Sequence, residues 1–119
     1  MRSYDLALIE GAGGWRVPLN NREFLSGLPK ALDIPVILVV GVKLGCINHA
    51  TLTVEAILRD GLKLAGWVAN HIDPEMSRSN ENMSTLHSII PAPCIGELSW
   101  LEKTNKEVVA EAMNLSQLV

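Results

Sequence analysis

Three continuous apolar runs, which start at residues 6, 36 and 64, constrain the fold of this 119-residue chain more than any other feature. They cover residues 6–9, 36–40 and 64–69. Continuous runs of this length, in contrast to alternating ones, are typical of strands that are buried on both faces of a parallel sheet. A shorter and weaker run at residues 95–98 is a fourth candidate strand.

The clearest helical pattern lies between the second and third runs. Asn48 is a residue type that caps helix N-termini, and Gly61 is suited to the position just after the last helical turn. Between them the apolar side chains recur at helical spacing. We therefore expect a helix that turns Leu52, Ile57 and Leu58 toward the core.

Helical patterns of lower regularity fill the other gaps. Residues 22–32 predict a short or broken helix, and residues 76–90 and 106–118 repeat apolar side chains at helical spacing. Alternation of strand and helix predicts parallel βαβ units with right-handed crossovers. The predicted fold class is therefore α/β, a mostly parallel sheet with flanking helices, in one domain that spans residues 1–119.

Composition excludes several classes of protein. The 10 Lys and Arg residues against 13 Asp and Glu residues give a net charge of −3 with no basic cluster, which argues against a nucleic-acid surface. No apolar run approaches the ~20 residues that span a membrane, and from the acidic residue early in the opening segment we expect no signal peptide there. Cys46 and Cys94 are too few for a disulfide framework, so we expect reduced thiols in a cytoplasmic protein.

The residues that follow the apolar runs are the candidate ligand contacts, because open parallel sheets bind ligands where their strands end. The first run is followed by Glu10 and by a glycine-rich segment, residues 11–14. A carboxylate at this position suits Mg²⁺, and glycines let a backbone approach an anion closely. A tight turn in which Glu10 accepts from nearby amides explains the same residues.

At the other strand ends, each candidate residue can be either a ligand contact or an ordinary structural residue. Gly45, Cys46 and Asn48 fall at a predicted helix N-terminus, which attracts carboxylate or phosphate but is also an ordinary capped loop. The Asn70 amide can pair with the donor and acceptor edge of adenine, or it can simply form a turn. Trp100 can cover a flat ligand or fill a gap between helices. The sequence contains no Gly-x-x-x-x-Gly-Lys-[Ser/Thr] motif.

Taken together, these segments resemble the dethiobiotin synthase family of biotin biosynthesis. The segments that match the family are residues 9–15, 35–50, 64–70, 90–93 and 96–101. Their order and spacing also agree with the family, and the resemblance extends over the chain from Tyr4 onward. The long central segment, residues 35–50, is specific to this family rather than to P-loop folds in general.

The resemblance implies a definite chemistry. Family members are cytoplasmic, homodimeric, ATP- and Mg²⁺-dependent ligases that convert diaminopelargonate and CO₂ to dethiobiotin. One amine takes up CO₂ as a carbamate, ATP phosphorylates the carbamate, and the second amine closes the ring and releases phosphate. The implied cofactor is Mg²⁺, and ATP is a substrate.

The resemblance also assigns site residues. Glu10 corresponds to the family's metal-binding carboxylate, and no residue of this chain is assigned a catalytic role. The residues that would receive the substrate carboxylate across the dimer interface are Leu44, Gly45, Cys46, Ile47 and Asn48. The residues that would bind the nucleotide are Gly11, Ala12, Gly13, Gly14, Asn70, His71, Ser99, Trp100, Leu101 and Glu107. The family has proline where Ser99 stands.

The family has an N-terminal half that this sequence does not match. That half holds the P-loop, a catalytic lysine and a second metal-binding aspartate. Phosphoryl transfer depends on positioning and on charge stabilisation, which these groups supply. We therefore expect an incomplete P-loop NTPase-like, doubly wound fold that is inactive alone, with a separate N-terminal half as one partner. The alternative is a non-catalytic carboxylate- or nucleotide-binding dimerisation module derived from the same family.

Overall fold

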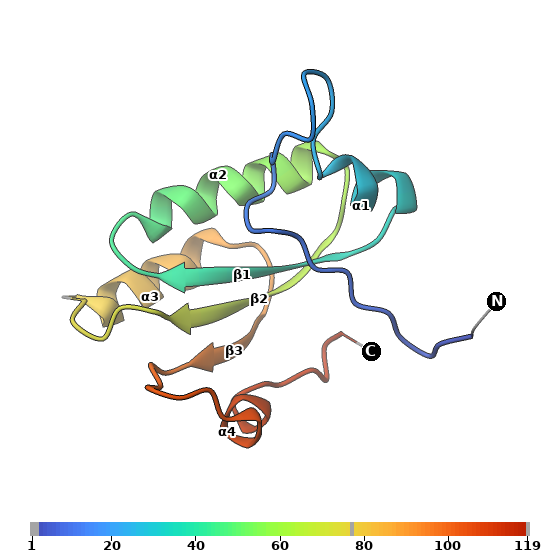
Figure 1. Ribbon diagram of the computed structural model, residues 1–119. Helices are drawn as coiled ribbons and strands as arrows, with labels where there is room; N and C mark the ends of the chain where they lie inside the picture. The colour runs from blue at the N-terminus through green and yellow to red at the C-terminus, as the bar shows by residue number, and fades with distance from the viewer. Residues whose placement is uncertain (1–2, 77, 119) are drawn as a thin grey trace.

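The computed structural model describes residues 3–76 and 78–118. Its elements, in chain order, are α1 (Gly27–Leu32), β1 (Val36–Val42), α2 (Cys46–Arg59), β2 (Leu64–His71), α3 (Ser79–Ile89), β3 (Cys94–Leu98) and α4 (Lys106–Glu111). The three strands form one parallel sheet in the order β1-β2-β3 (Figure 1). The α/β class and the parallel arrangement are confirmed.

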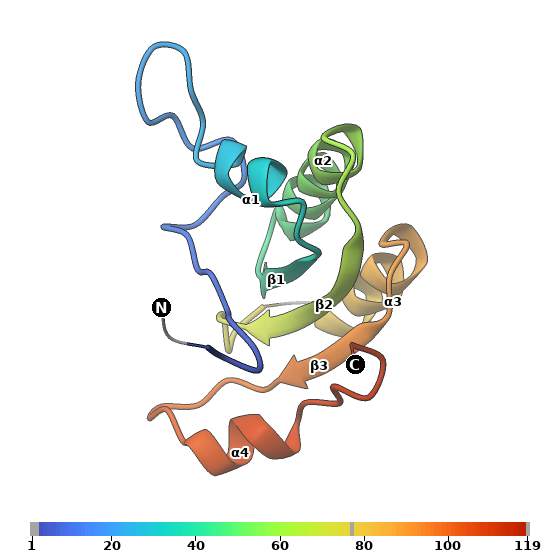
Figure 2. The same ribbon diagram turned by 90° about the vertical axis from the view of Figure 1, so that its right-hand side faces the viewer.

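Helices α2 and α3 lie on the same face of the sheet (Figure 2). Strand β1 is consequently buried on that face only: Val40 and Val42 are buried, whereas Ile37 and Val39 are 37% and 60% exposed. The prediction of a strand buried on both faces is wrong for β1. It is confirmed for the centre of β2, where Trp67 is fully buried and its neighbours on both sides are also buried.

Helix α2 covers the sheet with a stripe of side chains that differs from the predicted one. The buried residues of the helix are Cys46, Ala50, Val54 and Ile57. Ile57 was expected there, but Leu52 and Leu58 are 57% and 47% exposed, so their predicted inward orientation is wrong. The buried residues follow a helical spacing of four, four and three residues, which places them on one side of α2 and leaves Leu52 and Leu58 outside it.

The ends of α2 depend on two glycines. Gly45, at φ +90°, is the residue before the helix, whereas Asn48 lies within the first turn and does not cap it, so the predicted cap is wrong. Gly61, at φ +80°, follows the last turn as predicted, because the left-handed conformation that ends the helix favours glycine.

The first apolar run does not form a strand. Leu6, Leu8 and Ile9 are 72%, 81% and 56% exposed in an extended segment on the sheet face opposite α2 and α3 (Figure 2). A strand needs a neighbour to satisfy its backbone groups, and no strand among residues 3–76 and 78–118 pairs with this run. The predicted strand at residues 6–9 is therefore wrong for this chain as described.

Two predicted helices are shorter than expected. The helix at 22–32 is reduced to α1, because Pro18 and Phe24 form an isolated antiparallel bridge instead. The helix at 106–118 ends at Glu111, after which Met113 forms an antiparallel bridge with Gly96. This bridge pairs one residue on the free side of β3, whereas no strand or isolated bridge pairs the free side of β1 in the described part of the chain.

Candidate functional site

The carboxyl ends of the three strands lie at one rim of the sheet. The register pairs Val42 at the end of β1 with His71 at the end of β2, and Asn70 with Leu98 at the end of β3. Because the strands are parallel and in register, the segments that follow them emerge side by side. The rim therefore brings together the start of α2, Asn70 and the segment after β3.

A hollow of about 280 Å³ lies at the ends of β2 and β3. Its lining consists of Asn70, His71, Ile72, Leu98, Ser99, Trp100, Leu101, Thr104 and Val109. Five of these nine residues are among the predicted nucleotide contacts. Glu107, also predicted, does not line the hollow; it lies in the first turn of α4, where its backbone N–H donates to Asn105 Oδ1 at 3.0 Å.

The hollow has a mixed wall that suits a flat ligand with a polar edge. Trp100 is 48% exposed and offers an indole ring, and Leu101 and Val109 add aliphatic surface. Asn70 offers one acceptor and two donors. Sequence reasoning missed Thr104 and Val109, although the helical spacing of Val109 near the end of the chain was visible.

A polar pair stands beside this hollow. His71 Nε2 and Glu97 Oε1 are 2.8 Å apart, and the two side chains are 19% and 52% exposed. The strand register explains the contact, since Glu97 on β3 is the partner of Ala69 on β2. Sequence reasoning missed Glu97; its one signal was an acidic residue within an apolar strand.

The start of α2 occupies the same rim. Gly45 supplies no side-chain cap, and the first turn contains no acidic residue, so its backbone N–H groups have no side-chain acceptor. Leu44 is 91% exposed, whereas Cys46 is buried. The predicted substrate residues thus form a helix N-terminus without a side-chain cap, in which the Cys46 N–H donates to the Lys43 carbonyl at 3.0 Å and the Cys46 side chain is buried in the core.

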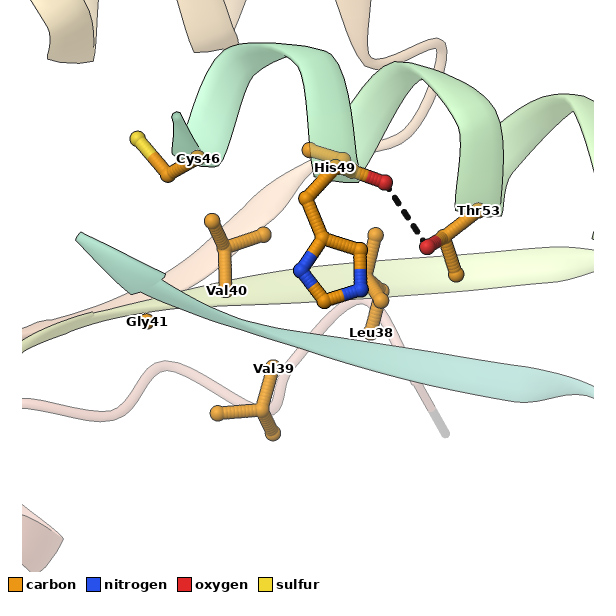
Figure 3. A pocket seen from close by; sticks show the side chains of 8 residues that line it. Leu38, Val39, Val40, Gly41, Cys46, His49 and Thr53 are labelled. Carbon is orange, nitrogen blue, oxygen red and sulfur yellow. Dashed lines mark hydrogen bonds between the residues drawn. The ribbon is translucent and has the colours of Figure 1, made fainter. Parts of the chain in front are cut away.

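A second, smaller hollow of about 70 Å³ lies between β1 and α2 (Figure 3). Its lining is Leu38, Val39, Val40, Gly41, Cys46, His49, Ala50 and Thr53. Figure 3 shows the His49 ring directed from α2 toward β1, and Thr53 Oγ1 donates to the His49 carbonyl at 2.8 Å. This apolar groove follows the edge of β1.

The glycine-rich segment, residues 11–14, is followed by two residues that anchor its C-terminal end away from the rim. Trp15 Nε1 donates to Asp60 Oδ2 at 2.8 Å, and Arg16 binds both oxygens of Asp60 at 2.8 Å. Asp60 follows α2, which has 14 residues and is therefore about 20 Å long. Gly14 thus lies near the opposite end of α2 from Gly45, and the structure does not bring residues 11–14 to the hollow.

The Asp60 carboxylate is a buried anchor, with only 6% of its side chain exposed. The hydrogen bond from Arg16 lowers the pKa of this carboxyl group, the Trp15 indole and the charge of Lys30 also lower it, and burial opposes them. Since the pKa is depressed in the folded state, the stabilisation is present at neutral pH and is lost as the pH falls through the folded-state pKa.

A magnesium ion needs several oxygen ligands that converge on one point. Within residues 3–76 and 78–118, no three His, Cys, Asp or Glu side chains are grouped so as to hold a metal ion. Glu10 is an exposed carboxylate, and Mg²⁺ takes more ligands than one side chain provides. The residues described do not form the site, so the metal role of Glu10 stays a prediction.

Comparison with known proteins identifies the family. A family model described as an AAA domain matches residues 1–108. A protein of Pseudomonas aeruginosa (strain UCBPP-PA14) named ATP-dependent dethiobiotin synthetase is 59% identical over 114 residues, which is 96% of this chain. The chain belongs to the dethiobiotin synthetase family. Dethiobiotin synthetases of Cellvibrio japonicus and Tolumonas auensis are 50% and 46% identical over 100% and 97% of the chain.

The chain spans about half the length of the dethiobiotin synthetases it matches: 50%, 52% and 51% of the Pseudomonas, Cellvibrio and Tolumonas proteins. The match supports the family and the partial P-loop NTPase-like fold. In the part of the chain that the structure describes, no helix is both long enough and apolar enough to cross a membrane.

Proposed function

We propose that this chain forms the part of an ATP-dependent dethiobiotin synthetase that binds adenine and the substrate carboxylate. The reaction joins CO₂ to diaminopelargonate and closes a ureido ring at the expense of ATP. The observation that carries the proposal is the hollow at the carboxyl ends of β2 and β3, whose lining includes Asn70 and Trp100. Family membership at 59% identity supports the same reaction.

The hollow suits the base of a nucleotide. The Asn70 amide matches the donor and acceptor edge of adenine, and the Trp100 ring provides a surface on which a flat base stacks. Complete ligand pockets have volumes of about 300–1,000 Å³, so a hollow of about 280 Å³ suits one part of ATP, the base. We propose that the triphosphate extends from it toward the start of α2.

The N-terminus of α2 suits the carboxylate of diaminopelargonate. Its backbone N–H groups lack side-chain acceptors, and the helix dipole favours an anion at this end. In the homodimer that the family resemblance implies, the carboxylate would come from the substrate bound by the other subunit.

The remaining half of the family protein would join the chain along β1. The edge of β1 has no partner among the described residues, its outer face exposes Ile37 and Val39, and an apolar groove follows it. An added strand would satisfy the backbone edge and cover these side chains. The apolar segment at residues 6–9 is exposed on the same side of the sheet and would be covered as well.

In this proposal the chain binds and orients, and it does not transfer protons. Asn70 and Trp100 hold the base, and the first turn of α2 holds the substrate carboxylate. The groups that stabilise charge during phosphoryl transfer, a P-loop and a lysine, belong to the half of the family protein outside this sequence. Positioning both substrates at one rim lowers the entropic part of the barrier.

The test joins the unmatched half of the Pseudomonas aeruginosa synthetase to this chain and measures dethiobiotin formed from diaminopelargonate, CO₂ and MgATP. We expect product from the joined protein and none from the 119-residue chain alone. A folded joined protein that binds ATP but forms no product would favour a binding module instead. Turnover by the chain alone would refute the proposed dependence on the other half.

A further inference from the structure

We propose that Gly96 is a positioning residue for nucleotide binding. Because it has no side chain, Met113 can lie against β3, and this contact fixes α4 together with the part of the hollow that α4 carries. The inference rests on the proposed function, in which the hollow takes the base of ATP. Neither Gly96 nor Met113 is among the residues that line the hollow, so both act through α4.

The first step is the reason for a glycine in β3. Gly96 is not among the described residues with a positive φ, so its backbone conformation would accept a side chain. The space around it would not. A Cβ atom at this position would overlap the sulfur of Met113 and would lie 3.2 Å from the carbonyl oxygen of Ala112. The missing side chain of this buried glycine therefore leaves the space that Met113 occupies.

The second step is the attachment of α4 to the sheet. This helix has six residues and buries none of them, so neither its length nor a buried face holds it in place. It lies on the side of β3 that faces away from β2 (Figures 1 and 2). After its last turn, Met113 forms the antiparallel bridge with Gly96. The next residue, Asn114, donates its N–H to the carbonyl of Ile95 at 2.6 Å, so β3 holds the C-terminal end of α4.

The third step is the connection between α4 and the hollow. Val109 lies on α4 and lines the hollow, as does Thr104 shortly before the helix. Asn70, which also lines it, comes instead from the end of β2. The N–H of Met113 donates to the carbonyl of Ala110 at 3.2 Å, so Met113 continues the last turn of the helix. A displacement of Met113 from β3 would therefore move Val109 relative to Asn70.

The contact lies outside the main hydrophobic core. That core is formed by β1, β2, α2, α3 and the residues next to them, and among the described residues it includes none from α4 or from the segment after it. Loss of the contact between Gly96 and Met113 should consequently leave the core in place. We therefore expect a change at Gly96 to affect the shape of the hollow more than the free energy of unfolding.

The test uses the joined protein described above and measures the dissociation constants of ATP and of inorganic triphosphate by calorimetry. Four variants are compared: Gly96→Ala, Met113→Ala, the double variant, and the matched control Gly27→Ala. Gly27 is exposed on α1, and a Cβ atom there would meet no atom within 4 Å. We expect Gly96→Ala to weaken ATP binding about tenfold and the control to leave it unchanged. Inorganic triphosphate has no base, so its affinity should be the same in all four variants.

Two further readouts connect the effect to Met113. Met113→Ala removes the sulfur that a side chain at position 96 would overlap, so the double variant should lose less ATP affinity than the product of the two single losses. Amide hydrogen exchange of the 119-residue chain should be faster at Asn114 in Gly96→Ala and unchanged at Trp67 in β2. The exchange result is independent of nucleotide binding, so it tests the attachment of α4 separately from the proposed function.

Several outcomes would overturn the inference. Unchanged ATP affinity in Gly96→Ala, an equal loss for ATP and inorganic triphosphate, or unchanged exchange at Asn114 would each do so while leaving the proposed function in place. If Gly96→Ala does not fold, Met113→Ala decides, because it only removes atoms: about threefold weaker ATP binding supports the inference, and unchanged binding overturns it. Absence of ATP binding by the unsubstituted joined protein would refute the proposed function, and the inference with it.

Discussion

Replacing Trp67 with alanine is expected to lower the free energy of unfolding by about 4 kcal/mol, the usual cost of removing a large buried aromatic side chain. Trp67 is fully buried at the centre of β2, and its ring meets that of His87 edge-on at 5.1 Å. The total free energy of unfolding of a domain of this size is about 5–15 kcal/mol. The variant should therefore keep only a fraction of its stability, and Asn70, three residues further along β2, would be held less firmly.

Urea denaturation followed by circular dichroism measures this effect. The matched control is Leu52→Ala on α2, which also truncates a large apolar side chain but at a position that is 57% exposed. The control should change the free energy of unfolding by less than about 0.5 kcal/mol. If Trp67→Ala does not fold, Trp67→Phe should show a smaller loss. Equal losses in Trp67→Ala and Leu52→Ala would contradict the burial of Trp67.

Replacing Asn70 with alanine in the joined protein is expected to weaken ATP binding about 10- to 100-fold, because a bidentate amide–adenine contact contributes about 1–3 kcal/mol. The Asn70 side chain lines the hollow at the end of β2. Since a carboxamide can present its donor and acceptor in either order, GTP binding should weaken as well.

Calorimetric titration with both nucleotides measures this loss. Asn80→Ala is the matched control, since Asn80 is an exposed asparagine in the first turn of α3 and does not line the hollow. The control should bind ATP as the unsubstituted protein does. Unchanged ATP affinity in Asn70→Ala would remove Asn70 from the proposed base site.

The sequence predicted the central sheet because its strands have local signals. The apolar runs at β1 and β2 and the helical spacing of α2 and α3 are properties of neighbouring residues. The run at residues 6–9 has the same local signal but no partner strand in the described part of the chain, so it is exposed. The local pattern of β1 also did not indicate that helices would cover only one of its two faces.

The candidate site was predictable where it depends on strand ends. Asn70 and Trp100 were expected at the rim because each follows an apolar run, and the structure brings them to one hollow. Contacts that depend on register or on distant segments were not predictable. Glu97 reaches His71 across 26 residues of sequence, and Asp60 reaches Trp15 across 45. No spacing rule connects such pairs before the sheet and the helix are assembled.

In the proposed function, the base of ATP binds in the hollow between the ends of β2 and β3. Photolabelling of the joined protein with an azidoadenine analogue of ATP, followed by peptide mapping, tests it directly. We predict that label is found in peptides from residues 70–72 and 98–104, and that excess ATP prevents it. Label confined to the β1–α2 groove, residues 38–53, or to the N-terminal segment would contradict the claim.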